Sequence, residues 1–293
     1  MTTTDIRVAV IGAGSWGTTV AALAAENTPT VLWARRSELA RQIDEAKVNP
    51  EYLPSFALPD ELRATDSLAD AVAHADVVVM AVPSHGYRDV ALEAAPSIRP
   101  WVPVVSLSKG LERTTLKRMS EVTSDVMPGH PVAVLTGPNL AKEILAGQPA
   151  ASVVAINDDT IGGELQRIFS RPSLRVYTNA DVIGCEVAGV VKNVIAIAAG
   201  MGDLLATSSS KQSRNNMVGL QLGAGTSIEE ILAGTNMVAE GVKSSPSVLD
   251  LARRYGVEMP ITEQVVAVCH EHRPAPDALA ALMQRSRKGE FEA

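Results

Sequence analysis

Lys192 is the residue of this sequence whose surroundings best suit proton transfer. It lies in the apolar stretch 187–199, in which only Lys192 and Asn193 have polar side chains. The stretch is too short for a membrane span, which needs about 20 apolar residues, so we expect a largely buried helix. Burial favours the neutral amine, which exchanges protons readily. Lys192 is therefore a candidate general acid/base; the alternative is a lysine whose amine reaches solvent from a half-buried helix.

Three further groups of residues that could take part in chemistry stand at the carboxyl ends of predicted strands. These groups are Val82–His85, Ser106–Gly110 and Thr136–Asn139. An ammonium such as that of Lys109 can polarise a carbonyl or contact a phosphate, although a solvated lysine is the plain alternative. His85 is either an acid or base, or a loop histidine that only lines a cofactor site. The carboxyl ends of strands are where open α/β sheets bind ligands.

A polar cluster follows the Lys192 stretch. Arg214 and Asn215 offer donors suited to a phosphate, and Asp203 could orient a cationic lysine. The same cluster could also be a solvated loop. The later stretch 236–242 mixes apolar residues with Glu240, and its pattern alone indicates no role.

The segment Gly12-Ala13-Gly14-Ser15-Trp16-Gly17 predicts a dinucleotide site. It directly follows an apolar strand-like run and opens a helix, which is the context this glycine pattern requires. Gly12 permits the tight turn, Gly14 lets a pyrophosphate approach the backbone, and Gly17 allows close packing of helix on strand. The alternative is a turn with packing glycines.

Arg35 and Arg36 favour NADPH over NADH. Folds that bind NAD usually hold the ribose 2′-hydroxyl with an acidic residue about 20 residues after the glycines. Two arginines follow the second strand-like run here, and Glu38 comes only later. Paired guanidinium groups suit a 2′-phosphate. Alternatively, the arginines are a solvated start of a helix.

Apolar runs that alternate with amphipathic stretches predict the elements that position these residues. The expected strands are Arg7–Ile11, Thr30–Trp33, Asp76–Val82, Val102–Leu107, Val132–Thr136, Ser152–Ile156 and Leu174–Thr178. The expected helices between them are Thr18–Glu26, Ser37–Lys47, Tyr87–Ala95, Thr114–Val126 and Leu140–Leu145. This alternation indicates a Rossmann-like, doubly wound parallel sheet at residues 1–184. Helical patterns alone continue over 185–293, which predicts an all-helical C-terminal domain for substrate and catalysis.

Composition excludes several classes of protein. The 293 residues are 46% hydrophobic and 20% charged, so the chain is not disordered. A net charge of −7 argues against a general nucleic-acid binder. Two cysteines, Cys185 and Cys269, are too few for a disulfide framework or a Cys-rich metal site, and we expect no metal. The N-terminus has no apolar leader, so we expect a cytoplasmic protein without integral membrane contact. The apolar helical second half favours a homodimer.

Taken together, these motifs resemble those of the bacterial NAD(P)-dependent glycerol-3-phosphate dehydrogenases over almost the whole chain. The first half carries Gly12–Gly17, Asn49–Pro54, Val82–His85, Ser108–Glu112 and Gly137–Glu143. The second half carries Lys192–Ile197, Gly202–Leu204, Ser213–Asn215, Val238–Val242 and Val257–Ile261. Related folds share the glycine pattern but not this ordered series. The resemblance implies interconversion of dihydroxyacetone phosphate and sn-glycerol 3-phosphate with NADPH or NADH, which feeds phospholipid synthesis.

The resemblance also implies roles for individual residues. Lys192 would be the general acid/base, Lys109 would assist electrostatically, and Asp203 would hold the lysine arrangement. The implied substrate-binding residues are Lys109, Gly137, Asn139, Lys192, Asp203, Ser213, Arg214 and Asn215. The implied cofactor-binding residues, together with Gly12, Gly14 and Gly17, are Ser15, Trp16, Arg35, Arg36, Lys109, Ala141, Arg214, Val238 and Glu240. The family often has Ser or Thr where this chain has Asn139.

One departure from the family pattern lies between Gly202 and Asp203. In the family a few tens of residues separate the lysine helix from the Gly-Asp-Leu motif, whereas Lys192 and Asp203 are only 11 residues apart here. There are two explanations: the protein lacks this segment, or the 293-residue sequence omits part of a longer chain. We favour the second. An intact mass near 30.9 kDa would contradict the omission. Two alternative functions remain. One is a related hydroxy-acid dehydrogenase, and the other, if the segment is truly absent, is a protein that binds NADPH without catalysis.

Overall fold

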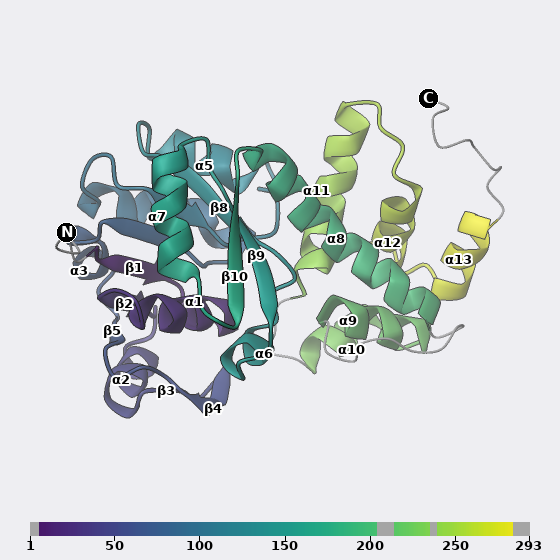
Figure 1. The fold of residues 1–293 in the computed structure, drawn as a ribbon. Coiled ribbons are helices and arrows are strands. Elements are labelled where there is room, and N and C mark those ends of the chain that lie inside the picture. Colours follow the sequence, from purple (N-terminus) through teal and green to yellow (C-terminus); the bar gives the residue numbers. More distant parts are fainter. Residues whose placement is uncertain (1–5, 204–213, 235–238, 284–293) are drawn as a thin grey trace. The chain divides into compact units, whose positions relative to one another are not determined.

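The protein forms two compact units, seen in a computed structural model that describes residues 6–203, 214–234 and 239–283 (Figure 1). The first unit comprises residues 1–112 and 117–189, and the second comprises residues 113–116 and 190–293. Helix α8 (Val182–Asp203) runs through the division at 189/190. The predicted boundary at 184/185 falls in the first turn of the same helix.

The first unit is built on an eight-stranded sheet with the order β10-β9-β8-β7-β6-β1-β2-β5. The strands are β1 (Val8–Ile11), β2 (Thr30–Trp33), β5 (Arg63–Thr65), β6 (Val77–Met80), β7 (Val104–Ser106), β8 (Val132–Thr136), β9 (Ala150–Ala155) and β10 (Leu174–Asn179). The chain leaves β1 toward β2 on one side and later returns to β6 on the other side. Ligands bind at such a switch point in doubly wound sheets, so the predicted Rossmann-like fold is confirmed and the segment after β1 is at its centre.

Two strands run opposite to the rest of the sheet, which corrects the expectation of a parallel sheet throughout. β8 pairs with β9 antiparallel, with Thr136 opposite Val153, and β10 is parallel to β9. The connection explains the reversal. A parallel return needs a helix that runs back along the strand, whereas α6 (Ala141–Leu145) has five residues, about 7.5 Å of helix.

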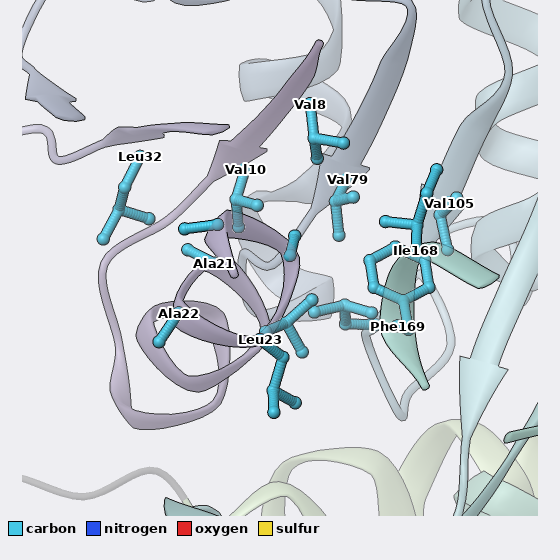
Figure 2. Close-up of a cluster of buried hydrophobic side chains, with 14 of the residues drawn as sticks. Val8, Val10, Ala21, Ala22, Leu23, Leu32, Val79, Val105, Ile168 and Phe169 are labelled. Atoms are coloured by element: carbon cyan, nitrogen blue, oxygen red, sulfur yellow. The ribbon is translucent and has the colours of Figure 1, made fainter. Parts of the chain in front are cut away.

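Helices cover both faces of this sheet because successive strand residues point to opposite sides. Val8 and Val10 of β1 pack with α1 (Ser15–Ala25), α2 (Ser37–Ala46) and α7 (Asp159–Phe169), as part of the cluster in Figure 2. Ala9 and Ile11 pack with α3 (Leu68–Ala73), α4 (Tyr87–Ala94) and α5 (Met119–Val126). Burial of alternate β1 residues in two cores fixes the register of the central strand.

A small antiparallel hairpin and the edge strand β5 were not predicted. The hairpin consists of β3 (Val48–Asn49) and β4 (Leu53–Ala57). These strands have two to five residues each, and none of them is a continuous apolar run like those that identified the other strands. The hairpin matters here because it carries residues that reach the glycine-rich segment.

In the described part of the second unit every regular element is a helix, as predicted. After α8 these helices are α9 (Arg214–Gly223), α10 (Ile228–Ala233), α11 (Glu240–Arg254), α12 (Pro260–His270) and α13 (Ala275–Met283). Figure 1 shows α11 and α12 side by side, with α13 following α12. Among the described residues, none of the helices has the length and apolar character that crossing a membrane requires.

Candidate active site

The glycine-rich segment after β1 forms a tight turn that leads directly into α1. Gly12 has a φ of 119°, and a Cβ there would lie 2.7 Å from the carbonyl oxygen of Ala81. A Cβ on Gly17 would lie 2.0 Å from the Gly12 carbonyl oxygen. A Cβ on Gly14, in contrast, would meet nothing within 4 Å. Packing of the protein itself therefore requires Gly12 and Gly17, whereas Gly14 borders open space.

The start of α1 is suited to an anion. Its N-cap residue Gly14 has no side chain to accept the first N–H groups, and its first turn holds no acidic residue. Free N–H donors and the positive end of a helix dipole bind phosphate groups. Beside them, the Nε1 of Trp16 is buried and has no acceptor within the part of the chain that the structure describes. Ser15, half-buried, is the first residue of α1.

Both predicted arginines lie at the carboxyl end of β2 with exposed side chains. The last residue of β2, Trp33, accepts a hydrogen bond from the Gly12 N–H at 3.0 Å, so this strand end adjoins the glycine-rich turn. Arg36 is the N-cap residue of α2, and its guanidinium donates a hydrogen bond to the Glu51 carboxylate. This contact raises the pKa of Arg36, which stays a cation. No role was predicted for Glu51, because only the folded chain brings it to Arg36.

Asn49 fastens the β3–β4 hairpin to the glycine-rich turn. Its side chain is fully buried, and its Nδ2 donates to the carbonyl of Ala13 at 2.9 Å and to Oγ1 of Thr18 at 2.8 Å. Its Oδ1 accepts the N–H of Tyr52 at 3.2 Å. Sequence reasoning gave Asn49 no role beyond its place in a family-like stretch, because these partners become neighbours only in the folded chain.

The carboxyl ends of β7 and β8 bring Lys109, Gly137 and Asn139 together. The half-buried Lys109 donates from Nζ to the carbonyl oxygen of Gly137 at 2.9 Å. The backbone N–H of Asn139 donates to the same oxygen at 2.9 Å, and its Oδ1 accepts from Ser152 Oγ at 2.7 Å. The Nδ2 of Asn139 is buried without an acceptor among the described residues. This edge of the sheet thus offers an ammonium and an amide donor to a ligand.

Helix α8 passes close to the same edge of the sheet. A Cβ on Gly189 would lie 2.8 Å from Thr136 Oγ1 and 3.9 Å from Cγ of Lys109. Only a glycine therefore allows the helix to approach the end of β8 this closely. His85 follows β6 in a single 3-10 turn (Ser84–Gly86) with its side chain exposed, which fits a loop residue better than a buried base.

A buried carboxylate holds the first half of α8 in place. Glu186, one turn before Gly189, accepts the backbone N–H of Ser120 at 2.9 Å and an Arg118 guanidinium N–H at 3.0 Å. Ser120 belongs to the first turn of α5, where a carboxylate also complements the helix dipole. Glu186 thereby fixes α8 beside the sheet edge that carries Lys109, and sequence reasoning missed it.

The expected burial of Lys192 is wrong. Its side chain is exposed, although it makes contacts with other groups of the protein. Helical periodicity accounts for this, because Val190, Val194 and Ile197 turn inward while Ile195 is 50% exposed. The stretch is apolar on more than one face but buries only one. The alternative from the sequence, a lysine whose amine reaches solvent from a half-buried helix, describes α8 correctly.

In the second unit, the predicted residues Asn215 and Glu240 lie near each other. The Oδ1 of Asn215 accepts the N–H of Gly241 at 3.1 Å, and Gly241 follows Glu240, the first residue of α11. A Cβ on Gly241 would lie 2.6 Å from the carbonyl oxygen of Asn193, so α11 begins against α8 next to Lys192.

The remaining predicted residues lie elsewhere. In the first unit, Ala141 begins α6. Ser213 and Val238 lie outside the described residues, as do the side chains of Asp203 and Arg214.

Known proteins match this chain along nearly its whole length. Residues 7–161 match the family described as NAD-dependent glycerol-3-phosphate dehydrogenase N-terminus, and residues 198–280 match its C-terminus. The chain belongs to this family. A glycerol-3-phosphate dehydrogenase [NAD(P)+] of Sphingopyxis alaskensis is 47% identical, with 96% of this chain and 97% of that protein covered. One of Mycobacterium avium is 42% identical, with 94% of each covered.

Solved structures agree with the family. The glycerol-3-phosphate dehydrogenase of Coxiella burnetii has a TM-score of 0.90 and 28% identity, with 96% of this chain and 99% of that chain covered. The resemblance seen in the motifs and the predicted Rossmann-like fold with a helical C-terminal region are therefore confirmed.

The glycerol-3-phosphate dehydrogenase family uses NAD(P), and the residues at the glycine-rich turn fit that cofactor. The uncapped start of α1 can bind a pyrophosphate, and the open space at Gly14 allows a close approach to the backbone. The cation of Arg36 lies at the end of β2, where the adenine ribose of a dinucleotide binds in this fold. NADPH and NADH both suit this set of donors.

The chain is shorter than its relatives inside the aligned region. The alignment with the Sphingopyxis protein spans 323 positions, whereas 96% of 293 residues is about 281, so about 42 positions have no residue in this chain. That number agrees in size with the segment of a few tens of residues expected between Gly202 and Asp203. The position of the gap stays a prediction.

Replacing Asn49 with alanine is expected to destabilise the first unit by about 1–3 kcal/mol, because the buried carbonyl of Ala13 loses its donor. Urea unfolding at equilibrium measures this loss. Asn27→Ala is the control, since Asn27 also donates from its side chain to backbone carbonyls but is exposed. Equal, small losses in both variants would show that Asn49 does not fasten the hairpin.

Proposed function

We propose that this protein interconverts dihydroxyacetone phosphate and sn-glycerol 3-phosphate with NADPH or NADH. The observation that carries the proposal is 47% identity, over nearly the whole of both chains, to a protein named glycerol-3-phosphate dehydrogenase [NAD(P)+]. The donors at the sheet edge are of the kind that a phosphorylated ketone requires. A panel of substrates tests it: turnover should be highest with dihydroxyacetone phosphate, and a preference for a hydroxy acid or its keto form would contradict it.

The chain supplies both the cofactor cradle and the substrate donors. N–H groups at the start of α1 bind the pyrophosphate, with Gly12, Gly14, Ser15, Trp16 and Gly17 around it. When bound, the nicotinamide supplies or accepts the hydride. Lys109 and the free amide donor of Asn139 hold and polarise the substrate, and the carbonyl of Gly137 positions the Lys109 ammonium at 2.9 Å. Ala141, Val238 and Glu240 complete the cofactor site.

Lys192 is the general acid/base of the proposed reaction. It protonates the alkoxide that forms as the ketone is reduced, and it removes the same proton in the reverse direction. Support comes from the similarity of the chain to the dehydrogenases, since the stretch Lys192–Ile197 is one of those that resemble the family. Asp203 orients the lysine, and Ser213, Arg214 and Asn215 bind the substrate, Arg214 at its phosphate and near the cofactor.

The gap of about 42 aligned positions favours one second candidate, a protein that binds NADPH without catalysis. We place the gap at 202/203, beside Asp203 and 11 residues after Lys192. A protein that lost part of its substrate site there would keep the complete cofactor half. Such a protein would bind NADPH but oxidise none when dihydroxyacetone phosphate is added.

Replacing Arg36 with glutamine is expected to raise the Michaelis constant for NADPH about fivefold and leave that for NADH nearly unchanged. Only NADPH carries the 2′-phosphate that a guanidinium binds with charge-assisted hydrogen bonds. In the unmodified protein the constant for NADPH should be the lower of the two. Similar constants, or a lower one for NADH, would refute the preference for NADPH.

In the cell this reaction would supply glycerol phosphate for phospholipid synthesis, in the cytoplasm. The homodimer is part of the same proposal, and sedimentation equilibrium tests it. A species of twice the intact protomer mass supports the homodimer, and a single species of the protomer mass contradicts it.

A further inference from the structure

The residue that contacts Arg36 in this structure is an acid, Glu51. The two side chains form a hydrogen-bonded ion pair at the carboxyl end of β2, on the side of the sheet where the glycine-rich turn lies. Their side chains are 56% and 40% exposed. Because water reaches both groups, the carboxylate can leave the guanidinium without losing its solvation, so the contact is one that a ligand can replace.

The backbone holds Glu51 at this place from both sides. Two residues before it, the buried Asn49 is bonded to Ala13 in the glycine-rich turn; one residue after it, the N–H of Tyr52 is bonded to Asn49. Arg36 is held as the N-cap residue of α2, three residues after Trp33, whose carbonyl accepts the N–H of Gly12. Both partners of the ion pair are thus fastened to the turn that binds the pyrophosphate.

We propose that Glu51 is a specificity-determining residue that limits the preference for NADPH over NADH by competing for the Arg36 guanidinium. The inference rests on the proposed role of Arg36 at the 2′-phosphate. A phosphate monoester carries between one and two negative charges near pH 7, so it must displace the Glu51 carboxylate from Arg36 and then tolerate it nearby. A ribose 2′-hydroxyl repels no carboxylate, and it can donate a hydrogen bond to one.

Glu51 therefore acts on the two cofactors in opposite directions. With NADPH it weakens binding through competition and like-charge repulsion. With NADH it keeps Arg36 neutralised and offers the kind of acidic acceptor that NAD-binding folds place at the ribose. A chain that has both the cation and the acid at this position can use both cofactors, with a ratio that Glu51 sets.

Direct binding measurements on Glu51→Gln test the inference without relying on turnover. Calorimetry gives dissociation constants for NADPH and NADH, and for the fragments adenosine 2′,5′-bisphosphate and AMP, which differ only in the 2′-phosphate. In Glu51→Gln the constants for NADPH and the bisphosphate should fall about threefold, the size expected for an exposed ion pair, while those for NADH and AMP stay equal or rise. Charge reversal in Glu51→Lys should produce a larger change in the same direction.

Glu45→Gln is the matched control. Glu45 is an exposed acid in the last turn of α2 that is bonded to Arg41, so its removal changes the net charge equally without freeing Arg36. Its four dissociation constants should equal those of the unmodified protein. If Glu45→Gln tightened NADPH binding as much as Glu51→Gln does, the effect would be one of net charge and the inference would fall.

Arg36→Gln separates failure of this inference from failure of the proposed cofactor role. If Arg36→Gln weakens binding of the bisphosphate and Glu51→Gln leaves the NADPH-to-NADH ratio unchanged, Glu51 is not a specificity determinant although Arg36 still binds the 2′-phosphate. If Arg36→Gln leaves bisphosphate binding unchanged, the role of Arg36 is wrong and the inference falls with it. In the Arg36→Gln background, Glu51→Gln should change the ratio less than it does alone, because the competition for Arg36 is gone and only the direct effects of the carboxylate on the ribose substituent remain.

Discussion

Replacing Lys192 with alanine is expected to lower turnover at least about 100-fold, because the ketone then gains its hydride without a general acid to protonate the alkoxide. The side chain is exposed on α8, so its removal leaves no cavity, and loss of its exposed contacts should lower the free energy of unfolding by no more than about 1 kcal/mol. Rates of NADPH oxidation at saturating dihydroxyacetone phosphate measure the effect on turnover.

Lys243→Ala provides the control for this variant. Lys243 is an exposed lysine on α11, in the same unit as Lys192, and its removal changes the net charge equally. Turnover of Lys243→Ala should be near normal. Near-normal turnover in Lys192→Ala as well would contradict the assignment of Lys192 as the general acid/base, and a loss of the same size in both variants would point to charge rather than chemistry.

Replacing Gly14 with alanine is expected to weaken NADPH binding roughly 10- to 100-fold without destabilising the protein. Its φ of −72° suits alanine, and the added Cβ meets no protein atom within 4 Å. The methyl group would instead occupy the space through which a pyrophosphate reaches the N–H groups of α1. Loss of one charge-assisted hydrogen bond, about 1.5–3 kcal/mol, accounts for the expected range.

Gly17→Ala should behave in the opposite way. Its Cβ would lie 2.0 Å from the Gly12 carbonyl oxygen, so α1 must move and the protein should lose about 1–3 kcal/mol of stability. Melting curves and calorimetric titration with NADPH on both variants separate the two effects. Unchanged NADPH binding in Gly14→Ala would mean that the turn is built from packing glycines and holds no pyrophosphate.

Most of the sheet could be predicted, because a strand covered on both faces is a continuous apolar run and seven such runs became strands. The direction of β9 and β10 could not. Apolar content indicates burial but not orientation, which depended here on the short helix α6. β5 and the β3–β4 hairpin were missed because strands of two to five residues are too short to show a periodicity.

The parts of the candidate site that could be predicted are those formed by residues that directly follow a strand in the sequence. The glycine-rich turn, the two arginines after β2 and the polar strand ends all depend on which residues follow a strand. Asn49, Glu51 and Glu186 were missed because their roles come from partners 15 to 68 residues away. The burial of Lys192 was misjudged because an apolar stretch does not show which of its faces packs against the protein.

The most direct test of the proposed function is the rate of NADPH oxidation on addition of dihydroxyacetone phosphate, measured on protein whose intact mass has been verified. We expect oxidation that depends on dihydroxyacetone phosphate and that is lost in Lys192→Ala. Protein of 30.9 kDa that binds NADPH in calorimetry but shows no such oxidation would contradict the dehydrogenase and identify a cofactor-binding protein without catalysis.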